Sequence, residues 1–268
     1  MKELSKGAAA LLVVSSAALA QDPSLSTRPG VELGAQVSYY EYTEPYFPNV
    51  PVTPKISGYR LGIVGAGTYT GAEPVFARLE LRASYGSLDY AGTGTISGVP
   101  DYIVEARGLV GTDLAGANAS LSPYLGFGYR YLFNDLRGYG SNSGGYRRYS
   151  TYLYVPVGVT VRFPMRNGWV LAPTLEGDIF LQGTQVSNLS DTGIPGYIDV
   201  TNRQDSGKGY RASAMLERGR WAFGAWMQYW HIGASDVQFA GVVQGIPRTG
   251  QEPENFTREY GIEARYRF

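Results

Sequence analysis

The chain has 268 residues, no cysteine, and 23 basic against 23 acidic side chains, so its formal net charge is zero. Disulfides and thiolate metal sites are therefore excluded, and no field of one sign is present to attract nucleic acid. Tyrosine is abundant, with 22 residues, and glycine contributes 36. Beyond the N-terminal segment, no apolar stretch approaches the roughly 20 residues of a membrane-spanning helix. The composition instead favours many β-strands.

The first twenty residues have the features of an export signal. Positive charge at Lys2 and Lys6 precedes an apolar run that ends in Ala18-Leu19-Ala20, the small-x-small pattern that signal peptidase cuts. The run is too short for a membrane anchor, which takes roughly 20 residues. We therefore predict a signal peptide over residues 1–20, a mature N-terminus at Gln21, a periplasmic segment over 21–29 and one domain over 30–268.

From about residue 30 onward, polar and apolar residues alternate in ten segments. In the segment 75–89, for example, Leu79 and Leu81 fall on one face and Glu80 and Arg82 on the other. Side chains repeat every two residues in a strand and every 3.6 in a helix, so the pattern predicts strands. Each is long enough to cross an outer membrane as a tilted strand of about 9–11 residues. The predicted strands lie near 31–39, 57–70, 75–89, 102–113, 119–133, 149–163, 169–183, 208–217, 221–231 and 256–268.

The connections between the predicted strands alternate in length. Tight turns follow the second, fourth, sixth and eighth strands, and long loops rich in Gly, Ser, Asn and Pro follow the odd-numbered strands. Short periplasmic turns and long extracellular loops are typical of transmembrane barrels. We therefore predict an all-β fold, a closed antiparallel transmembrane β-barrel of about ten strands. Pro123, Pro156 and Pro173 fall within strands, where we expect bulges or strand ends.

A soluble lipocalin-like barrel or sandwich would show the same alternation, with its apolar residues inside. The aromatic residues distinguish the two. Trp221 and Phe223 lie near short turns, and Tyr85 and Tyr102 near long loops, all on the apolar face. Two aromatic belts are typical of a surface that faces lipid. The apolar face is therefore predicted to point outward.

The last eight residues carry an assembly pattern. In Gly261-Ile262-Glu263-Ala264-Arg265-Tyr266-Arg267-Phe268 a glycine precedes apolar or aromatic residues at alternate positions, ending in Phe. This resembles the signal that outer-membrane barrels present to their assembly machinery, and Gly261, Tyr266 and Phe268 carry it. Over its length the chain resembles the porin-like bacterial outer-membrane β-barrel proteins. The resemblance implies location in the cell outer membrane.

The expected partners follow from that location: membrane lipid, lipopolysaccharide and the barrel-assembly machinery. No nucleic-acid partner and no cofactor are expected, and the oligomeric state is left open. Asp89, Asp101, Asp191 and Asp205 show no metal-ligand spacing and are expected to be solvated loop carboxylates.

The polar face of the predicted strands would line the lumen with charge. Strand register is expected to place Arg82 near Glu105 and Arg107, and barrel closure to place Arg265 and Arg267 near Glu32. Arginine forms paired hydrogen bonds to carboxylates, which suits a crowded interior. A barrel this narrow is nearly filled by side chains, so we expect a structural membrane protein or a narrow porin-like channel for small solutes. The predicted network comprises Glu32, Arg60, Arg78, Glu80, Arg82, Glu105, Arg107, Arg130, Glu176, Asp178, Arg211, Glu259, Glu263 and Arg265.

His231 is the one histidine of the chain, so an active site of the known outer-membrane enzyme types that use a histidine would have to include it. Omptin proteases are ten-stranded barrels that use an Asp pair and an Asp-His pair, but the acid two positions before His231 is missing. The lipid A deacylase pattern places a serine two positions after its histidine, where this chain has Gly233. Ser235 and Asp236 could approach His231, yet nothing fixes that geometry, and we predict no enzymatic activity.

Two other functions stay open. One is a surface adhesion or receptor module that uses the long loops 184–207 and 232–255. The other is a hydrolase at the rim of the barrel, centred on His231.

Overall fold

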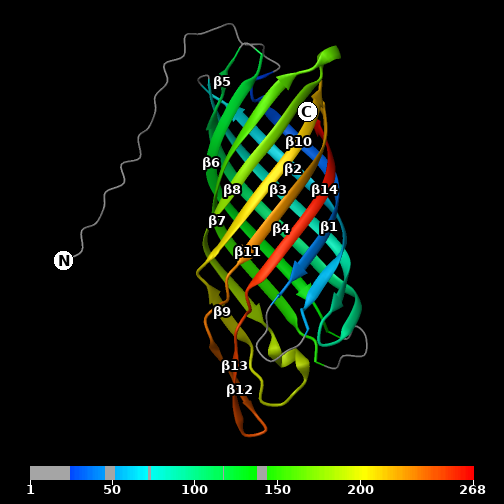
Figure 1. The fold of residues 1–268 in the computed structure, drawn as a ribbon, viewed down its shortest axis with the longest axis vertical. Coiled ribbons are helices and arrows are strands. Elements are labelled where there is room, and N and C mark those ends of the chain that lie inside the picture. Colours follow the sequence, from blue (N-terminus) through cyan, green and yellow to red (C-terminus); the bar gives the residue numbers. More distant parts are fainter. Residues whose placement is uncertain (1–24, 46–51, 72–73, 117, 138–143) are drawn as a thin grey trace, which may run out of the picture.

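The computed structural model describes residues 25–45, 52–71, 74–116, 118–137 and 144–268. Within these residues ten long strands form one closed antiparallel barrel, which Figure 1 shows as a tall cylinder. The predicted fold class is thereby confirmed. The barrel strands are β1 (Gly30–Thr43), β2 (Lys55–Thr70), β3 (Val75–Ala91), β4 (Thr95–Thr112), β6 (Ser120–Asp135), β7 (Arg147–Pro164), β8 (Val170–Ser187), β10 (Gly207–Arg218), β11 (Trp221–Ile232) and β14 (Asn255–Arg267).

Closure depends on the pairing of the first and last strands. β14 lies between β11 and β1, with Glu32 opposite Arg267 and Ala35 opposite Ala264. Each described barrel strand therefore has two neighbours, and the barrel presents no sheet edge. Such a closed ladder satisfies backbone N–H and C=O groups without help from water, which a strand in lipid requires. No helix in the described part of the chain is long and apolar enough to cross a membrane.

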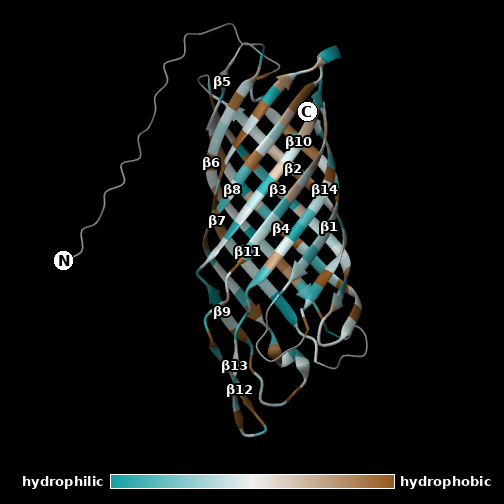
Figure 2. Ribbon diagram, in the orientation of Figure 1, coloured by the Kyte–Doolittle hydropathy of each residue, from teal (hydrophilic) through white to brown (hydrophobic). Residues whose placement is uncertain are grey.

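Side chains alternate between the outer face and the lumen along each strand. On β3, Leu79 is 54% and Leu81 53% exposed on the outer face, whereas the intervening Glu80 points inward and is paired with arginines. Figure 2 shows the same alternation as hydrophobic and hydrophilic bands along the strands. An apolar outer wall around a charged interior suits hydrocarbon surroundings rather than water.

Several strands extend further than predicted. β4 begins at Thr95 rather than near residue 102, and only residues 92–94 separate it from β3. The long loop predicted between these strands is therefore wrong. The extension also places Asp101 inside β4, where it is 1% exposed, so its assignment as a solvated loop carboxylate is wrong as well.

The prolines within strands behave differently from one another. Pro123 stays in register opposite Val159, and Pro173 opposite Ala214, so the bulges expected at these two positions do not occur. Near Pro156 the ladder is irregular: pairing between β7 and β8 shifts register between Leu153 and Tyr154. A proline removes one donor from the ladder, yet at Pro123 and Pro173 the register continues without a shift.

The two ends of the barrel differ in their connections. Short turns join strands at one end, together with β5 (Leu114–Ala115) and the 3-10 turn η2 (Arg166–Gly168). At the other end the connections carry η3 (Leu189–Thr192), β9 (Val200–Gln204), and a hairpin of β12 (Gln238–Val243) and β13 (Ile246–Gly250) that projects beyond the barrel (Figure 1). We refer to these as the short-turn end and the long-loop end.

The N-terminal segment covers the short-turn mouth of the lumen. Thr27 donates through its backbone N–H and its hydroxyl to the carboxylate of Asp113, at 2.7 and 2.8 Å. Leu25 is buried, and the Arg28 guanidinium lies 2.6 Å from the Glu217 carboxylate. The predicted signal peptide over 1–20 and the cleavage point at Gln21 lie outside the described residues.

The outer face can be tested with a charge. We expect Leu79→Arg to destabilise folding into bilayers by about 2–4 kcal/mol if residue 79 lies near the midplane, because arginine would meet hydrocarbon. Equilibrium urea unfolding in lipid vesicles measures the change. Gln238→Arg in the β12–β13 hairpin is the matched control, since it adds the same side chain beyond the barrel wall. If Leu79→Arg is as stable as wild type, the outer face does not meet lipid.

Candidate functional site

The lumen is the candidate site, and it has three parts. The lumen network is the set of charged residues predicted above, and it fills the middle of the barrel. The aromatic layer is a cluster of buried apolar side chains next to it, toward the long-loop end. The mouth cluster is the group Glu44, Arg148, Gln185 and Glu252, which lies at the long-loop end.

Every residue of the predicted network points into the lumen and lies within 4 Å of an oppositely charged partner. Arg211 of β10 has three carboxylate partners. Its guanidinium lies 2.9 Å from Glu105, 3.0 Å from Glu176 and 3.1 Å from Asp178. Glu105 belongs to β4, which is not a neighbour of β10, so this arginine links strands across the lumen.

Strand register and ion pairing do not always coincide. Arg82 lies opposite Glu105 in the ladder, but its ion pair is with Glu263 of β14, at 3.6 Å. Its guanidinium also stacks over the Trp226 ring, 4.1 Å from the centroid. Long side chains on a tilted strand reach partners across the interior, so the nearest ladder position does not decide the contact.

Barrel closure brings a group of charges to the short-turn side of the network. The Glu32 carboxylate accepts from Arg78 at 2.8 Å and from Arg267 at 3.0 Å, and it lies 3.7 Å from Arg265. These arginines come from β3 and β14. Glu32 of β1 therefore connects β14, its neighbour at the closure of the barrel, with β3, which is not its neighbour. Charge-assisted hydrogen bonds of this kind are among the strong ones in proteins.

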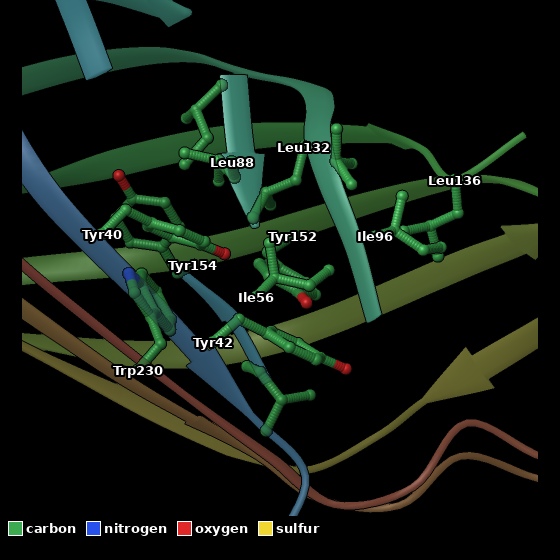
Figure 3. Packing of buried hydrophobic residues seen from close by; sticks show 13 residues of the cluster. Tyr40, Tyr42, Ile56, Leu88, Ile96, Leu132, Leu136, Tyr152, Tyr154 and Trp230 are labelled. Carbon is green, nitrogen blue, oxygen red and sulfur yellow. The ribbon is translucent and has the colours of Figure 1, made fainter. Parts of the chain in front are cut away.

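The aromatic layer was not predicted. Trp230 of β11 packs edge-to-face on Tyr154 of β7, with ring centroids 5.0 Å apart, and lies 6.1 Å from Tyr152. Figure 3 shows these rings pointing toward one another inside the barrel. The buried cluster consists of Tyr40, Tyr42, Ile56, Leu88, Ile96, Val99, Ile103, Leu132, Leu136, Tyr152, Tyr154, Trp230 and Ile232.

A signal for this layer is present in the sequence. Tyr40, Leu88 and Ile103 occupy the inward positions of their strands, where alternation alone would place polar residues. Apolar residues on both faces near one end of a strand indicate a buried interior at that level.

Arginines that stack on aromatic rings join the lumen network to the aromatic layer. The Arg60 guanidinium lies 3.3 Å from the Tyr40 ring centroid, and that of Arg130 lies 6.0 Å from Trp230. Arg60 also pairs with Asp101, which the sequence analysis placed on a loop. Arginine stacks well on aromatic faces while its edge donates to carboxylates. The two arginines therefore belong to both parts.

The mouth cluster places two carboxylates around one hydroxyl. The Tyr42 hydroxyl lies 2.7 Å from Glu44 and 2.8 Å from Glu252, and Arg148 lies 3.1 Å from Glu44 and 3.6 Å from Glu252. A phenol carries one proton, so when it bonds both carboxyl groups one of them must donate. Burial and the charge of Glu44 raise the pKa of Glu252 to about 7, against the pull of Arg148.

The residues of the predicted assembly pattern have structural surroundings of their own. Tyr266 and Phe268 lie on the outer face, with Tyr266 packed edge-to-face on Trp221. A Cβ at Gly261 would lie 2.6 Å from the Trp226 ring, so only glycine fits there without rearrangement. Their role in assembly stays a prediction.

His231 lies on the outer face near the long-loop end. Its Nε2 contacts the carboxylate of Glu254, and its ring stacks on Phe256 at 4.6 Å. The Ser235 hydroxyl donates to the Asp236 carbonyl instead. Within the described residues, His231 makes no hydrogen bond to Ser235 or Asp236. No group of three or more acidic or histidine side chains that could hold a metal occurs in the same part of the chain.

The fold was compared with known proteins. No protein-family model and no curated protein matches the chain. The outer-membrane protease OmpT from Escherichia coli has a similar structure, with a TM-score of 0.60 and 11% identity over 89% of this chain and 95% of that one. The fold is that of an outer-membrane barrel.

Two further outer-membrane barrels are more distant. The translocator domain of the autotransporter NalP from Neisseria meningitidis has a TM-score of 0.42 and 13% identity, covering 90% of each chain. An outer-membrane channel from Pseudomonas putida F1 has a TM-score of 0.41 and 10% identity, covering 94% of this barrel and 100% of its own chain. At these identities the likeness concerns the fold, so the function has to be argued from this barrel's own residues.

The central role of Arg211 can be tested by removing its charge. We expect Arg211→Met to lower the free energy of unfolding by about 3–5 kcal/mol, because buried carboxylates lose their partner. Asp178 loses its one ion-pair partner among the described residues. Urea unfolding in detergent micelles measures the change, with Arg218→Met on the same strand as control, since Arg218 contacts the Trp169 ring and forms no ion pair in the described chain. Equal stability of both variants would contradict a structural network.

The mouth cluster predicts a pH dependence. The folded-state pKa of Glu252, about 7, is above its ordinary value, so the folded protein binds this proton more tightly than the unfolded chain does. The resulting stabilisation is complete below the ordinary pKa and is lost as pH rises through about 7. Urea unfolding at pH 5 and pH 8 should show this loss in wild type and less of it in Glu252→Gln. Asp205→Asn, which removes an exposed loop carboxylate paired with Arg203, should behave as wild type does.

Proposed function

We propose that this chain works as a closed structural barrel of the outer membrane, exported by the signal over residues 1–20, whose lumen does not conduct ions at rest. The observation that carries the proposal is the aromatic layer. Trp230 and Tyr154 come from strands that are not neighbours, and they touch inside the lumen. Trp230 is 1% and Tyr154 0% exposed, so no water-filled passage runs beside them.

The remaining parts of the lumen support the same conclusion. Arg107 and Arg211 of the lumen network lie within hydrogen-bond distance of carboxylates, so these arginines are not free charges that would attract permeant ions. At the short-turn end, Leu25 and Thr27 are buried within the mouth. A barrel of this strand number is expected to be filled by side chains rather than open.

Planar-bilayer recording tests the proposal. Wild type should show no steady conductance, whereas the double variant Tyr154→Ala with Trp230→Ala should conduct or become noisy, because it removes the contact across the lumen. The matched control is Tyr210→Ala with Tyr229→Ala, which removes two stacked rings from the outer face.

Two results would count against a closed lumen. A large steady conductance of wild type would favour the narrow-channel interpretation. A double variant as silent as wild type would show that the aromatic layer is not what blocks the passage.

A second candidate function is contact with a partner outside the cell, through the long-loop end. The β12–β13 hairpin exposes Phe239 and Ile246, at 55% and 53%, beyond the barrel. The loop around β9 is attached to it, since the Ile198 N–H donates to the Ala240 carbonyl at 3.2 Å. Exposed apolar patches on loops favour binding of another macromolecule. This role is compatible with a closed lumen.

We propose no hydrolytic role for His231. The Glu254 carboxylate holds its Nε2 and Phe256 covers its ring, so the imidazole has the surroundings of a residue that packs at the surface. Ser235, the nearest candidate nucleophile in sequence, accepts the Glu252 N–H at 2.8 Å and donates elsewhere.

A further inference from the structure

A cavity of about 160 Å³ lies in the lumen between the lumen network and the N-terminal segment. Thr27 and Arg28 line it from the short-turn mouth, and Arg82 and Trp226 lie deeper in the barrel. An engineered protein cavity of about 150 Å³ is known to accept benzene, so this volume holds a molecule of about that size. The aromatic layer bounds the cavity on the long-loop side, and the N-terminal segment bounds it on the short-turn side.

The wall of the cavity combines two kinds of surface. Phe76, Leu109, Ala172 and Met215 contribute apolar side chains. The remainder is dominated by charge, and arginines outnumber glutamates by eight to five. A ligand that satisfies both surfaces has an apolar body and an anionic group.

Two of the arginines lack a close carboxylate. Arg82 lies 3.6 Å from Glu263, and Arg162 lies 3.9 Å from Asp113, beyond hydrogen-bond distance in both cases. The other arginines of the wall are each within hydrogen-bond distance of a carboxylate, among the residues that the structure describes. Arg162 donates to the Ser122 hydroxyl at 2.8 Å, but neither cation has a carboxylate at hydrogen-bond distance. Confined cations of this kind favour the entry of an anion, since charge-assisted hydrogen bonds form at short distance.

Further donors in the same wall have no partner. Trp226 is 7% exposed, and its indole N–H makes no hydrogen bond; neither does the Nε of Arg265. One acceptor, the Oε2 of Glu263, is also without a hydrogen bond and lies next to Arg82. Buried donors are nearly always satisfied in folded proteins, so the unmatched N–H groups indicate a missing acceptor.

We propose that this cavity binds a small organic monocarboxylate of about the size of benzoate. Arg82 would hold the carboxylate, supported by the stacked Trp226 ring that fixes the guanidinium from behind. The apolar body would lie toward Phe76, Leu109 and Met215. Arg82 can take this role without loss of the network, because Glu263 keeps its ion pair with Arg265 at 2.7 Å.

Isothermal titration of the full folded chain in detergent tests the proposal. Benzoate should bind saturably, and benzamide, its neutral analogue, should bind at least about tenfold more weakly, because the charge-assisted bonds to Arg82 are lost. Arg82→Met should weaken benzoate binding by a similar factor. Arg258→Met, which removes an exposed arginine from the outer face, is the matched control and should leave binding unchanged.

Three outcomes would overturn the proposal: no benzoate binding at millimolar concentration, equal binding of benzoate and benzamide, or full binding by a folded Arg82→Met variant. The benzoate and benzamide comparison needs no variant, so it decides the matter even if Arg82→Met does not fold. The titration uses no bilayer. A steady conductance of wild type in planar bilayers would contradict the proposal of a closed lumen. It would not contradict the proposed binding site, because the titration measures binding and not conduction.

Discussion

Charges enclosed by a hydrogen-bonded wall have to neutralise one another, and the rest of this barrel depends on that constraint. A guanidinium that is buried in this way needs carboxylates within reach. Arg211 meets this need with acids from β4 and β8, and Glu32 meets it with arginines from β3 and β14. Pairs of this kind connect strands that the backbone ladder does not, so they oppose changes in the cross-section of the barrel as well as in register.

The interior is consequently layered. Charge is concentrated in the middle and toward the short turns, and apolar rings occupy the adjacent level toward the long-loop end. The boundary is made by arginines whose flat faces rest on aromatic rings while their edges reach carboxylates, as Arg60 does between Tyr40 and Asp101. This arrangement gives Arg60 both a ring and a carboxylate at the border of the aromatic layer, and a cavity remains on the charged side.

Much of this could be predicted from sequence, and the failures have physical reasons. Alternation assigns each residue a face, which is why the members of the lumen network could be named. Their partners could not, because a contact such as Arg211 with Glu105 depends on side-chain reach across the barrel. Gly98 and Pro100 locally favour a loop at the start of β4, yet pairing with β3 overrides that preference. Glu252 joins its cluster only because a loop folds back over the mouth.

The N-terminal segment touches parts of the barrel that are far apart in the chain. Thr27 is bonded to Asp113, just beyond β4, and Arg28 to Glu217 and the Gly219 carbonyl, at the turn between β10 and β11. Asp113 and the turn with Glu217 and Gly219 come close together only when the strands around the whole barrel have paired. The segment that leads into the first strand can therefore settle only after the last strands have been added, which makes the sealing of this mouth a late event in assembly.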